Sequence, residues 1–231
     1  MGVGSGKWHR CRLLLTPHPS RLTLTMPGNL FIVSAPSGAG KTSLVAALLD
    51  ADPHVRKSVS FTTRKPRPGE VNGREYNFVT VDAFERMRAQ GEFVESALVH
   101  GNHYGTSHQW IGARLAEGHD ILLEIDWQGA AQVRKVNPAA ITIFILPPSY
   151  EALLSRLNSR ATDAPEIIAR RLHNAHEEIS HLIDFDYVII NEDFDQAAQE
   201  LAAIVVAERL KRPRQSGRHQ ELFKQLLQPP Q

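Results

Sequence analysis

A short apolar run passes into a glycine-rich segment over residues 30–42, which read LFIVSAPSGAGKT. Leu30–Val33 consists of residues that favour β-strands, and Leu44–Leu49 is an apolar, helix-like segment. A strand, a glycine-rich turn and a helix in this order constrain the fold, because they form the first unit of a parallel α/β sheet. The turn lets backbone N–H groups face one anion, and the positive end of the helix dipole points there too. The segment therefore predicts a phosphate-binding loop.

The loop matches the pattern G-x-x-x-x-G-K-[ST] except at its first position, where Ala35 replaces glycine. Alanine is small enough for a tight turn, so the prediction stands. In this pattern Lys41 reaches the β- and γ-phosphates, and the Thr42 hydroxyl holds Mg²⁺. The predicted nucleotide-binding residues are Ala35, Pro36, Ser37, Gly38, Ala39, Gly40, Lys41 and Thr42.

Strand and helix patterns alternate after this loop, which favours a parallel sheet flanked by helices. Strand patterns occur at 54–61, 76–81, 92–99, 120–127, 141–146 and 187–190. Helical patterns occur at 82–90, 111–117, 128–136, 194–209 and 221–227, and two more begin at Ser149 and Pro165. Asp82 and Ser149 are the predicted N-caps of their helices. Residues 55–106 hold short strands and little helix, with a turn-rich loop at 101–107, so we expect an inserted, mostly β subdomain.

Charge and cysteine content narrow the classes of partner. Of the 26 basic residues, Lys7, Arg10, Arg12 and Arg21 lie in the acid-free stretch 1–25. Residues 26–231 therefore hold 22 basic and 25 acidic side chains, and their net negative charge argues against nucleic-acid binding. No apolar run approaches the roughly 20 residues of a membrane-spanning helix, so no membrane partner is expected. Cys11 is the single cysteine, which fits a reducing, cytoplasmic location.

Two groups of arginines lie outside the loop. Arg156, Arg160 and Arg171 lie on a predicted helix, a polar break and a second helix, a shape typical of a closing lid. Guanidinium groups suit a transferring phosphoryl group, because they stay cationic and donate hydrogen bonds in pairs. Arg64 and Arg67 lie in the stiff, basic segment TTRKPRPGE of the inserted part. Two separate anion-binding groups indicate two phosphorylated substrates.

No obvious general base accompanies these groups. A phosphate monoester, with a second pKa of about 6, is mostly dianionic at neutral pH and needs orientation rather than deprotonation. The pattern therefore favours a nucleoside monophosphate over an alcohol as the phosphoryl acceptor.

Four motifs together resemble bacterial guanylate kinase. They are APSGAGKT, SFTTRKPRPGExxGxxYxF, GNxYGT and LxIDWQG, in the family's order, between about residues 28 and 209. The arginine segment with its following tyrosine is specific to this family among nucleotide-binding proteins. The resemblance implies a P-loop type fold with a GMP-binding insert and a helical lid. It also implies transfer of the γ-phosphoryl group of Mg·ATP to GMP, giving GDP and ADP, in purine nucleotide metabolism.

The resemblance also implies residue roles. Those for phosphoryl transfer are Lys41, Arg156, Arg160 and Arg171, with Asn191 at the adenosine side of ATP. Those for the GMP phosphate are Ser60, Arg64, Arg67, Tyr76 and Tyr104. Those for guanine are Glu95, Thr106 and Asp126. Carboxylates accept from the guanine N2 amino group, whereas a hydroxyl can donate to O6.

Two positions depart from the family pattern. The lid often reads Gly-Arg-Gly, and here Ser159 and Ala161 flank Arg160, which could stiffen the lid. Glu124 stands where many relatives have Asp, so the charge is kept while its reach changes. Neither change removes a group that the chemistry needs.

Two other functions stay open from the sequence. Guanylate-kinase-like scaffold domains bind peptides without catalysis, but Lys41, Thr42 and the lid arginines argue against that interpretation. A kinase for a sugar phosphate is the second, and Glu95 and Tyr76 favour guanine instead.

The expected domain organisation has three parts. They are a basic, disordered extension at 1–27 with Met26 as an alternative start, a kinase-like domain at 28–209, and a basic linker with a C-terminal helix at 210–231. Within the domain, the GMP-binding insert is expected at about 55–106 and the lid at about 155–175. The sequence is compatible with a homo-oligomer and leaves the oligomeric state open.

Overall fold

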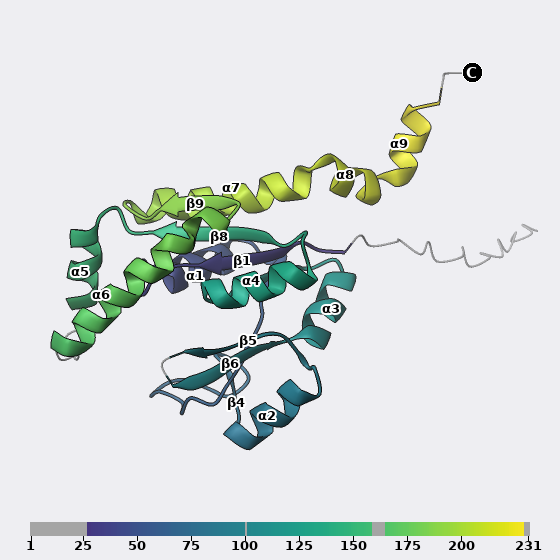
Figure 1. Cartoon of the computed structure of the whole chain (residues 1–231). Coiled ribbons are helices and arrows are strands. Elements are labelled where there is room, and N and C mark those ends of the chain that lie inside the picture. The colour runs from purple at the N-terminus through teal and green to yellow at the C-terminus, as the bar shows by residue number, and fades with distance from the viewer. Residues whose placement is uncertain (1–26, 100, 159–164, 229–231) are drawn as a thin grey trace, which may run out of the picture.

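The computed structural model of the protein describes residues 27–99, 101–158 and 165–228 (Figure 1). Its larger sheet, called the large sheet below, has five parallel strands in the order β2-β7-β1-β8-β9. These strands are β1 Leu30–Ser34, β2 Val55–Lys57, β7 Asp120–Glu124, β8 Ile141–Leu146 and β9 Tyr187–Ile190. The predicted α/β class with a parallel sheet is thereby confirmed.

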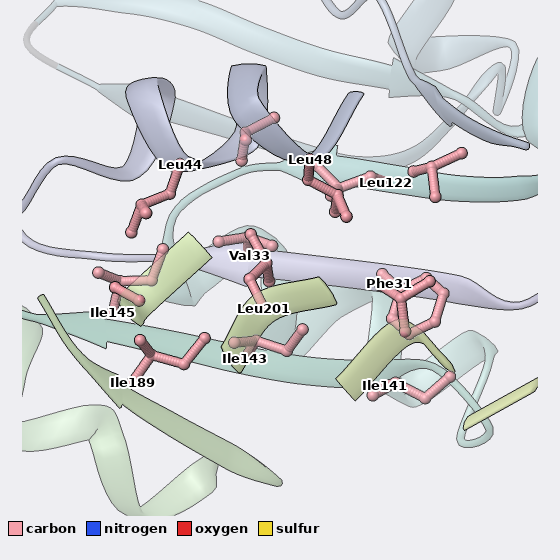
Figure 2. Close-up of a cluster of buried hydrophobic side chains, with 14 of the residues drawn as sticks. Phe31, Val33, Leu44, Leu48, Leu122, Ile141, Ile143, Ile145, Ile189 and Leu201 are labelled. Atoms are coloured by element: carbon pink, nitrogen blue, oxygen red, sulfur yellow. The ribbon is translucent and has the colours of Figure 1, made fainter. Parts of the chain in front are cut away.

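Helices pack on both faces of the large sheet. They are α1 Lys41–Ala51 and α7 Phe194–Leu210 on one face, and α3 His108–Ala116 and α4 Trp127–Val136 on the other. Phe31 and Val33 of β1 point into the first core, which Figure 2 shows together with side chains of α1 and α7. Leu30 and Ile32 point into the second core. Because β1 is buried on both faces, it reads as an unbroken apolar run.

A smaller, mixed sheet, called the small sheet below, has four strands in the order β4-β3-β6-β5. They are β3 Phe61–Thr62, β4 Asn77–Phe78, β5 Phe93–Val99 and β6 Asn102–Ser107. Helix α2 (Val81–Ala89) packs on this sheet through Phe84, whose fully buried ring stacks on Phe93 with 4.7 Å between ring centroids. In Figure 1 the small sheet and α2 lie below the large sheet.

The remaining helices follow β8 and α7. They are α5 Tyr150–Asn158, α6 Pro165–Ser180, a 3₁₀ turn His181–Asp184, α8 Arg212–Arg218 and α9 Gln220–Leu226. Helices α8 and α9 extend beyond the end of α7 and away from the large sheet (Figure 1). Among the helices that the structure describes, none is both long and apolar enough to cross a membrane.

Two predictions within the inserted part were wrong. The strand predicted at 54–61 is two strands in different sheets, since the Ser58 N–H still bonds to Leu122 of β7 whereas the Ser60 carbonyl accepts from Asn77. The loop predicted at 101–107 contains strand β6, which pairs with β3 and β5. Gly105 sits there because a Cβ would lie 3.0 Å from the rings of Phe84 and Phe93, not because the chain turns.

Other local predictions need correction as well. The strand predicted at 76–81 is reduced to β4, and the helix after it is capped by Thr80, whose hydroxyl accepts the Ala83 N–H at 3.2 Å. Asp82 lies in the first turn, where its charge suits the helix dipole. The basic linker predicted at 211–218 is helix α8, with Pro213 in its first turn. Its helical signal was hidden because it lacks apolar periodicity.

Candidate active site

The predicted phosphate-binding loop lies between the end of β1 and the start of α1, where the parallel strands of the large sheet end. Gly38 and Gly40 both have φ of +94°, a conformation that residues with a Cβ rarely adopt. A side chain is doubly excluded at Gly40, because its Cβ would lie 2.3 Å from Nδ2 of Asn191. The loop conformation therefore depends on both glycines.

Asn191 follows β9 and supports the loop from behind. Its side chain is buried, and its Nδ2 donates a hydrogen bond to the Ala39 carbonyl at 2.7 Å. Arg156 on α5 in turn donates from Nη2 to the Asn191 carbonyl at 2.9 Å. The hydrogen bond of the Asn191 side chain is thus with the loop backbone, and its contact with the adenosine side of ATP stays a prediction.

Glu124 gathers three polar side chains at the start of α1. Thr42 donates its hydroxyl to Oε1 of Glu124 at 2.5 Å, and Nζ of Lys41 lies 3.7 Å from the same oxygen. Lys57, at the end of β2, forms an ion pair with Oε2. Burial alone would raise the pKa of Glu124, but the two lysines and these hydrogen bonds hold the pKa below its ordinary value. Burial lowers the pKa of Lys41.

The predicted guanine-reading residues come together between the small sheet and α4. Glu95 on β5 is only 3% exposed, and its Oε1 accepts the Thr106 hydroxyl at 2.5 Å. The Thr106 hydroxyl lies 3.1 Å from that of Ser60. Asp126 caps α4 by accepting the Gly129 N–H at 2.8 Å. Gly129 allows Glu95 to approach, because a Cβ there would lie 2.9 Å from Oε2 of Glu95.

Burial raises the pKa of Glu95 to about 7, and the charge of Asp126 adds to this rise. The hydrogen bond from Thr106 opposes it, because it stabilises the ionised carboxylate. Glu95 therefore changes charge in the physiological range, unlike an exposed glutamate.

The arginine segment folds around Glu70. Arg64 donates to Oε1 of Glu70 at 2.8 Å, and the Arg67 N–H donates to Oε2 at 2.7 Å. The Arg64 guanidinium also lies over the Tyr76 ring, 5.4 Å from its centroid. Tyr76 packs edge-on against Tyr104, with 5.8 Å between ring centroids. Arg64, Tyr76 and Tyr104 are thus brought together as predicted, whereas the Arg67 side chain is exposed.

A cavity of about 350 Å³ lies between the phosphate-binding loop and several of the predicted acceptor residues. Its lining residues include the loop residues Ser37, Lys41 and Thr42 on one side and Ser60, Tyr76, Glu95, Tyr104 and Asp126 on the other. The loop and the predicted acceptor residues therefore face one space, although they come from different sheets.

The side chains of two residues predicted to act in phosphoryl transfer lie outside the part of the chain that the structure describes. Arg160 falls in 159–164, outside the described residues. Arg171 lies on α6, and its side chain is not among the described ones. The N-terminal extension predicted at 1–27 lies outside the described residues up to position 26.

Sequence reasoning missed two charged residues of this site, Lys57 and Glu178. Lys57 ends a parallel strand of the large sheet, which is where ligand sites of α/β proteins gather, so its position was a usable signal. Glu178 lines the cavity from α6 and accepts the Ser37 N–H at 3.3 Å. It lies on an amphipathic helix whose sequence pattern does not distinguish it from a solvated residue.

Comparisons with known proteins identify the family of the chain. Residues 27–208 match the family model for guanylate kinase. A guanylate kinase of Methylobacillus flagellatus is 57% identical over 202 residues, covering 87% of this chain and 100% of that protein. One of Thiobacillus denitrificans is 58% identical over 197 residues, covering 85% and 94%.

A solved structure of a guanylate kinase also matches this chain. The crystal structure of guanylate kinase from Anaplasma phagocytophilum matches with a TM-score of 0.72 and 36% identity, covering 90% of this chain and 100% of that one. The chain belongs to the guanylate kinase family.

Proposed function

We propose that this chain transfers the γ-phosphoryl group of ATP to the phosphate of GMP, giving ADP and GDP, inside the cavity between the loop and the small sheet. Membership of the guanylate kinase family supports the reaction. The observation that carries the residue assignment is the cavity, because it brings a phosphate-binding loop and the buried Glu95 carboxylate, which Thr106 holds, to one space. Phosphoryl transfer between two nucleotides requires that proximity.

On the ATP side, the backbone N–H groups of residues 37–42 would bind the phosphates, and Lys41 would neutralise their charge. Thr42 and Glu124 offer oxygen atoms 2.5 Å apart, the donor type that Mg²⁺ takes. Thr42 would hold the ion, with Glu124 beside it. Mg²⁺ held there would supply positive charge that offsets the negative charge of the transferred group.

On the guanine side, Glu95 and Asp126 would accept from the N1 and N2 donors of the base. The Thr106 hydroxyl donates to Glu95 and can accept from the Ser60 hydroxyl, so it holds Glu95 in place; it would have to turn its proton away from Glu95 to donate to O6. A site built on such bonds rejects adenine, because its buried carboxylates would lose their partners.

On the GMP phosphate side, Arg64, Arg67, Tyr76 and Tyr104 would hold the acceptor, next to Ser60. Glu70 fixes the arginine segment by binding both the Arg64 guanidinium and the Arg67 backbone. The acceptor phosphate needs no general base, since it is already mostly dianionic at neutral pH. Catalysis would therefore come from orientation and charge neutralisation.

Three further assignments belong to the same proposal. Arg156, Arg160 and Arg171 would stabilise the charge of the transferring group. The proposed domain division keeps a lid at about 155–175 and an acceptor-binding insert that ends at about 106, but the insert would begin after β2 rather than at 55, because β2 belongs to the large sheet. The enzyme would work in the cytoplasm, in keeping with its single cysteine.

The test is a coupled assay of ADP release with GMP, AMP, UMP and IMP as acceptors. We expect kcat/KM for AMP and UMP to be lower than for GMP by roughly 10³-fold or more. IMP lacks the N2 amino group, so it should fall between GMP and AMP. Equal rates with AMP and GMP would contradict the guanine assignment, and a Lys41→Met variant controls for contaminating kinases.

A further inference from the structure

A carboxylate on α6 accepts a hydrogen bond from a backbone N–H group of the phosphate-binding loop. Oε2 of Glu178 accepts the Ser37 N–H at 3.3 Å, and Glu178 lines the same cavity as Lys41 and Thr42. The Ser37 N–H belongs to the set of backbone donors that the loop presents to phosphate. A negatively charged side chain thus lies where the loop is built to receive another anion.

The charged surroundings of Glu178 come from three elements. Lys41 at the start of α1 attracts its carboxylate, whereas Asp126 at the start of α4 and Glu177 on α6 repel it. Glu95 and Glu124 line the same cavity. Burial raises the pKa of Glu178 to about 7, Asp126 adds to the rise, and the Ser37 N–H and Lys41 oppose it.

A carboxylate and a phosphate cannot share this donor without cost. Both are anionic acceptors that form charge-assisted hydrogen bonds with N–H groups, and two like charges at contact distance repel strongly in a buried site. Either the carboxylate leaves, or it takes up a proton and loses its charge. Both routes reduce the affinity for phosphate while Glu178 is ionised.

We propose that Glu178 and the phosphate chain of ATP compete for the Ser37 N–H, so that Glu178 is a positioning residue that limits the affinity for ATP. The inference rests on the proposed function only in naming ATP as the ligand. ATP binding then protonates Glu178 beside the loop. Near neutral pH the binding of ATP is accompanied by proton uptake, because the bound phosphates favour the uncharged form of Glu178.

The first experiment measures KM for ATP from about pH 6 to pH 8.5, with GMP saturating at each pH. Glu178→Gln keeps an acceptor for Ser37 but removes the charge. At the alkaline end we expect KM for ATP to fall roughly three- to tenfold in this variant, with kcat within about twofold of the parent chain. The parent KM should rise with pH through neutrality, whereas the Glu178→Gln profile should stay flatter.

The matched control is Glu177→Gln. Glu177 is exposed on the same helix and does not line the cavity, so this variant makes the same charge change without touching the loop. We expect its KM to stay close to that of the parent chain and its pH profile to keep its shape with a small shift to lower pH, because Glu177 is the weakest of the influences that raise the pKa of Glu178. Glu178→Ala adds a structural comparison: it removes both charge and acceptor, so it should also bind ATP more tightly than the parent chain.

The second experiment needs no phosphoryl transfer. Calorimetric titration of the full chain with Mg·ATP, without GMP, in two buffers of different ionisation heat gives the number of protons taken up. We expect uptake in the parent chain and in Glu177→Gln at neutral pH, and less in Glu178→Gln. If GMP is not phosphorylated but this difference is found, the proposed reaction fails while the role of Glu178 stands.

Two results would overturn the inference. One is an equal affinity for ATP and equal proton uptake in the parent chain and Glu178→Gln at every pH. The other is weaker ATP binding in Glu178→Gln, which would mean that the carboxylate assists the nucleotide rather than competing with it.

Discussion

The two sheets of this protein differ in what holds them together. In the large sheet, β1 is buried at every position, and β7 and β8 are buried at all but their last residue. In the small sheet, β4 has no fully buried residue, and β5 has one, which is Glu95. The loop thus stands on an apolar core, whereas the acceptor residues stand on strands with few buried apolar residues, against which Phe84 of α2 packs on Phe93.

On the two sides of the cavity, the residues that stabilise the fold and the residues proposed to bind the substrates are related differently. Burial of apolar side chains stabilises most of the large sheet, and its buried ion pair, Asp120–Arg209, lies at the start of β7, away from the loop. The polar residues at the carboxyl ends of its strands are therefore free to bind phosphate. In the small sheet, a buried carboxylate has to be part of the fold. A functional group that is buried and charged lowers stability unless its partners compensate.

The largest effect that tests this contrast is expected for Lys41→Met. Removing a preorganised cation from the transferring phosphates should lower kcat by roughly 10²- to 10³-fold in the coupled assay. The apolar core beneath the loop is unchanged, so the midpoint of thermal unfolding should move little. A variant that keeps more than about a tenth of the activity would contradict the role of Lys41.

The same contrast explains which parts of the structure could be predicted. Ile141–Leu146 was predicted at the residues where it occurs, because buried parallel strands read as continuous apolar runs. Tyr187–Ile190 was also predicted at its own residues from a short apolar run, although it is an edge strand in which only Ile189 is buried. Strand β6 was read as a loop because it contains Gly105 and polar residues, and its pairing depends on partners distant in sequence.

The residues of the site also differ in whether the sequence could predict them. The motif residues of the loop and the acceptor set were predicted, and the structure brings most of them to one cavity. Glu178 was missed because no local pattern marks it, and its contact with Ser37 spans 141 positions of the chain. Contacts of this kind depend on how α6 packs against the loop, which a single sequence does not encode locally.

The next largest effect concerns an ion-pair network behind the large sheet. Arg209 on α7 contacts Oδ2 of Asp120 and Oδ2 of Asp52, each at 2.5 Å, and Asp120 is 7% exposed. In Arg209→Met the buried Asp120 loses its counter-charge, so the free energy of unfolding should fall by about 3 kcal/mol. Urea unfolding measures this, and a loss below about 1 kcal/mol would show that the apolar core alone suffices.

A smaller effect of opposite sign is expected for Glu95→Gln. The pKa of Glu95 is about 7 in the fold and 4.5 as its ordinary value, so the folded state binds more protons than the unfolded one. Stability from this group is therefore lost as pH rises from about 4.5 through 7. Above that range, Glu95→Gln should be more stable than the parent chain by about 2 kcal/mol.

The gain in Glu95→Gln should come with weaker GMP binding, because the amide cannot accept as a carboxylate does. Glu92→Gln, at an exposed position just before β5, is the control and should leave both properties unchanged. If the free energy of unfolding of Glu95→Gln equals that of the parent chain at alkaline pH, the buried carboxylate does not destabilise the small sheet.

The smallest effect is expected for Arg88→Ala on the outer face of α2. Arg88 pairs with Glu85 at 2.5 Å, but both side chains are exposed, 53% and 36% respectively. Water screens such a pair, so the free energy of unfolding should fall by no more than about 0.5 kcal/mol. A loss above about 1 kcal/mol in urea unfolding would show that surface charges help to hold the small sheet. The buried contacts around Glu95 and Phe84 would then no longer be sufficient to account for its stability.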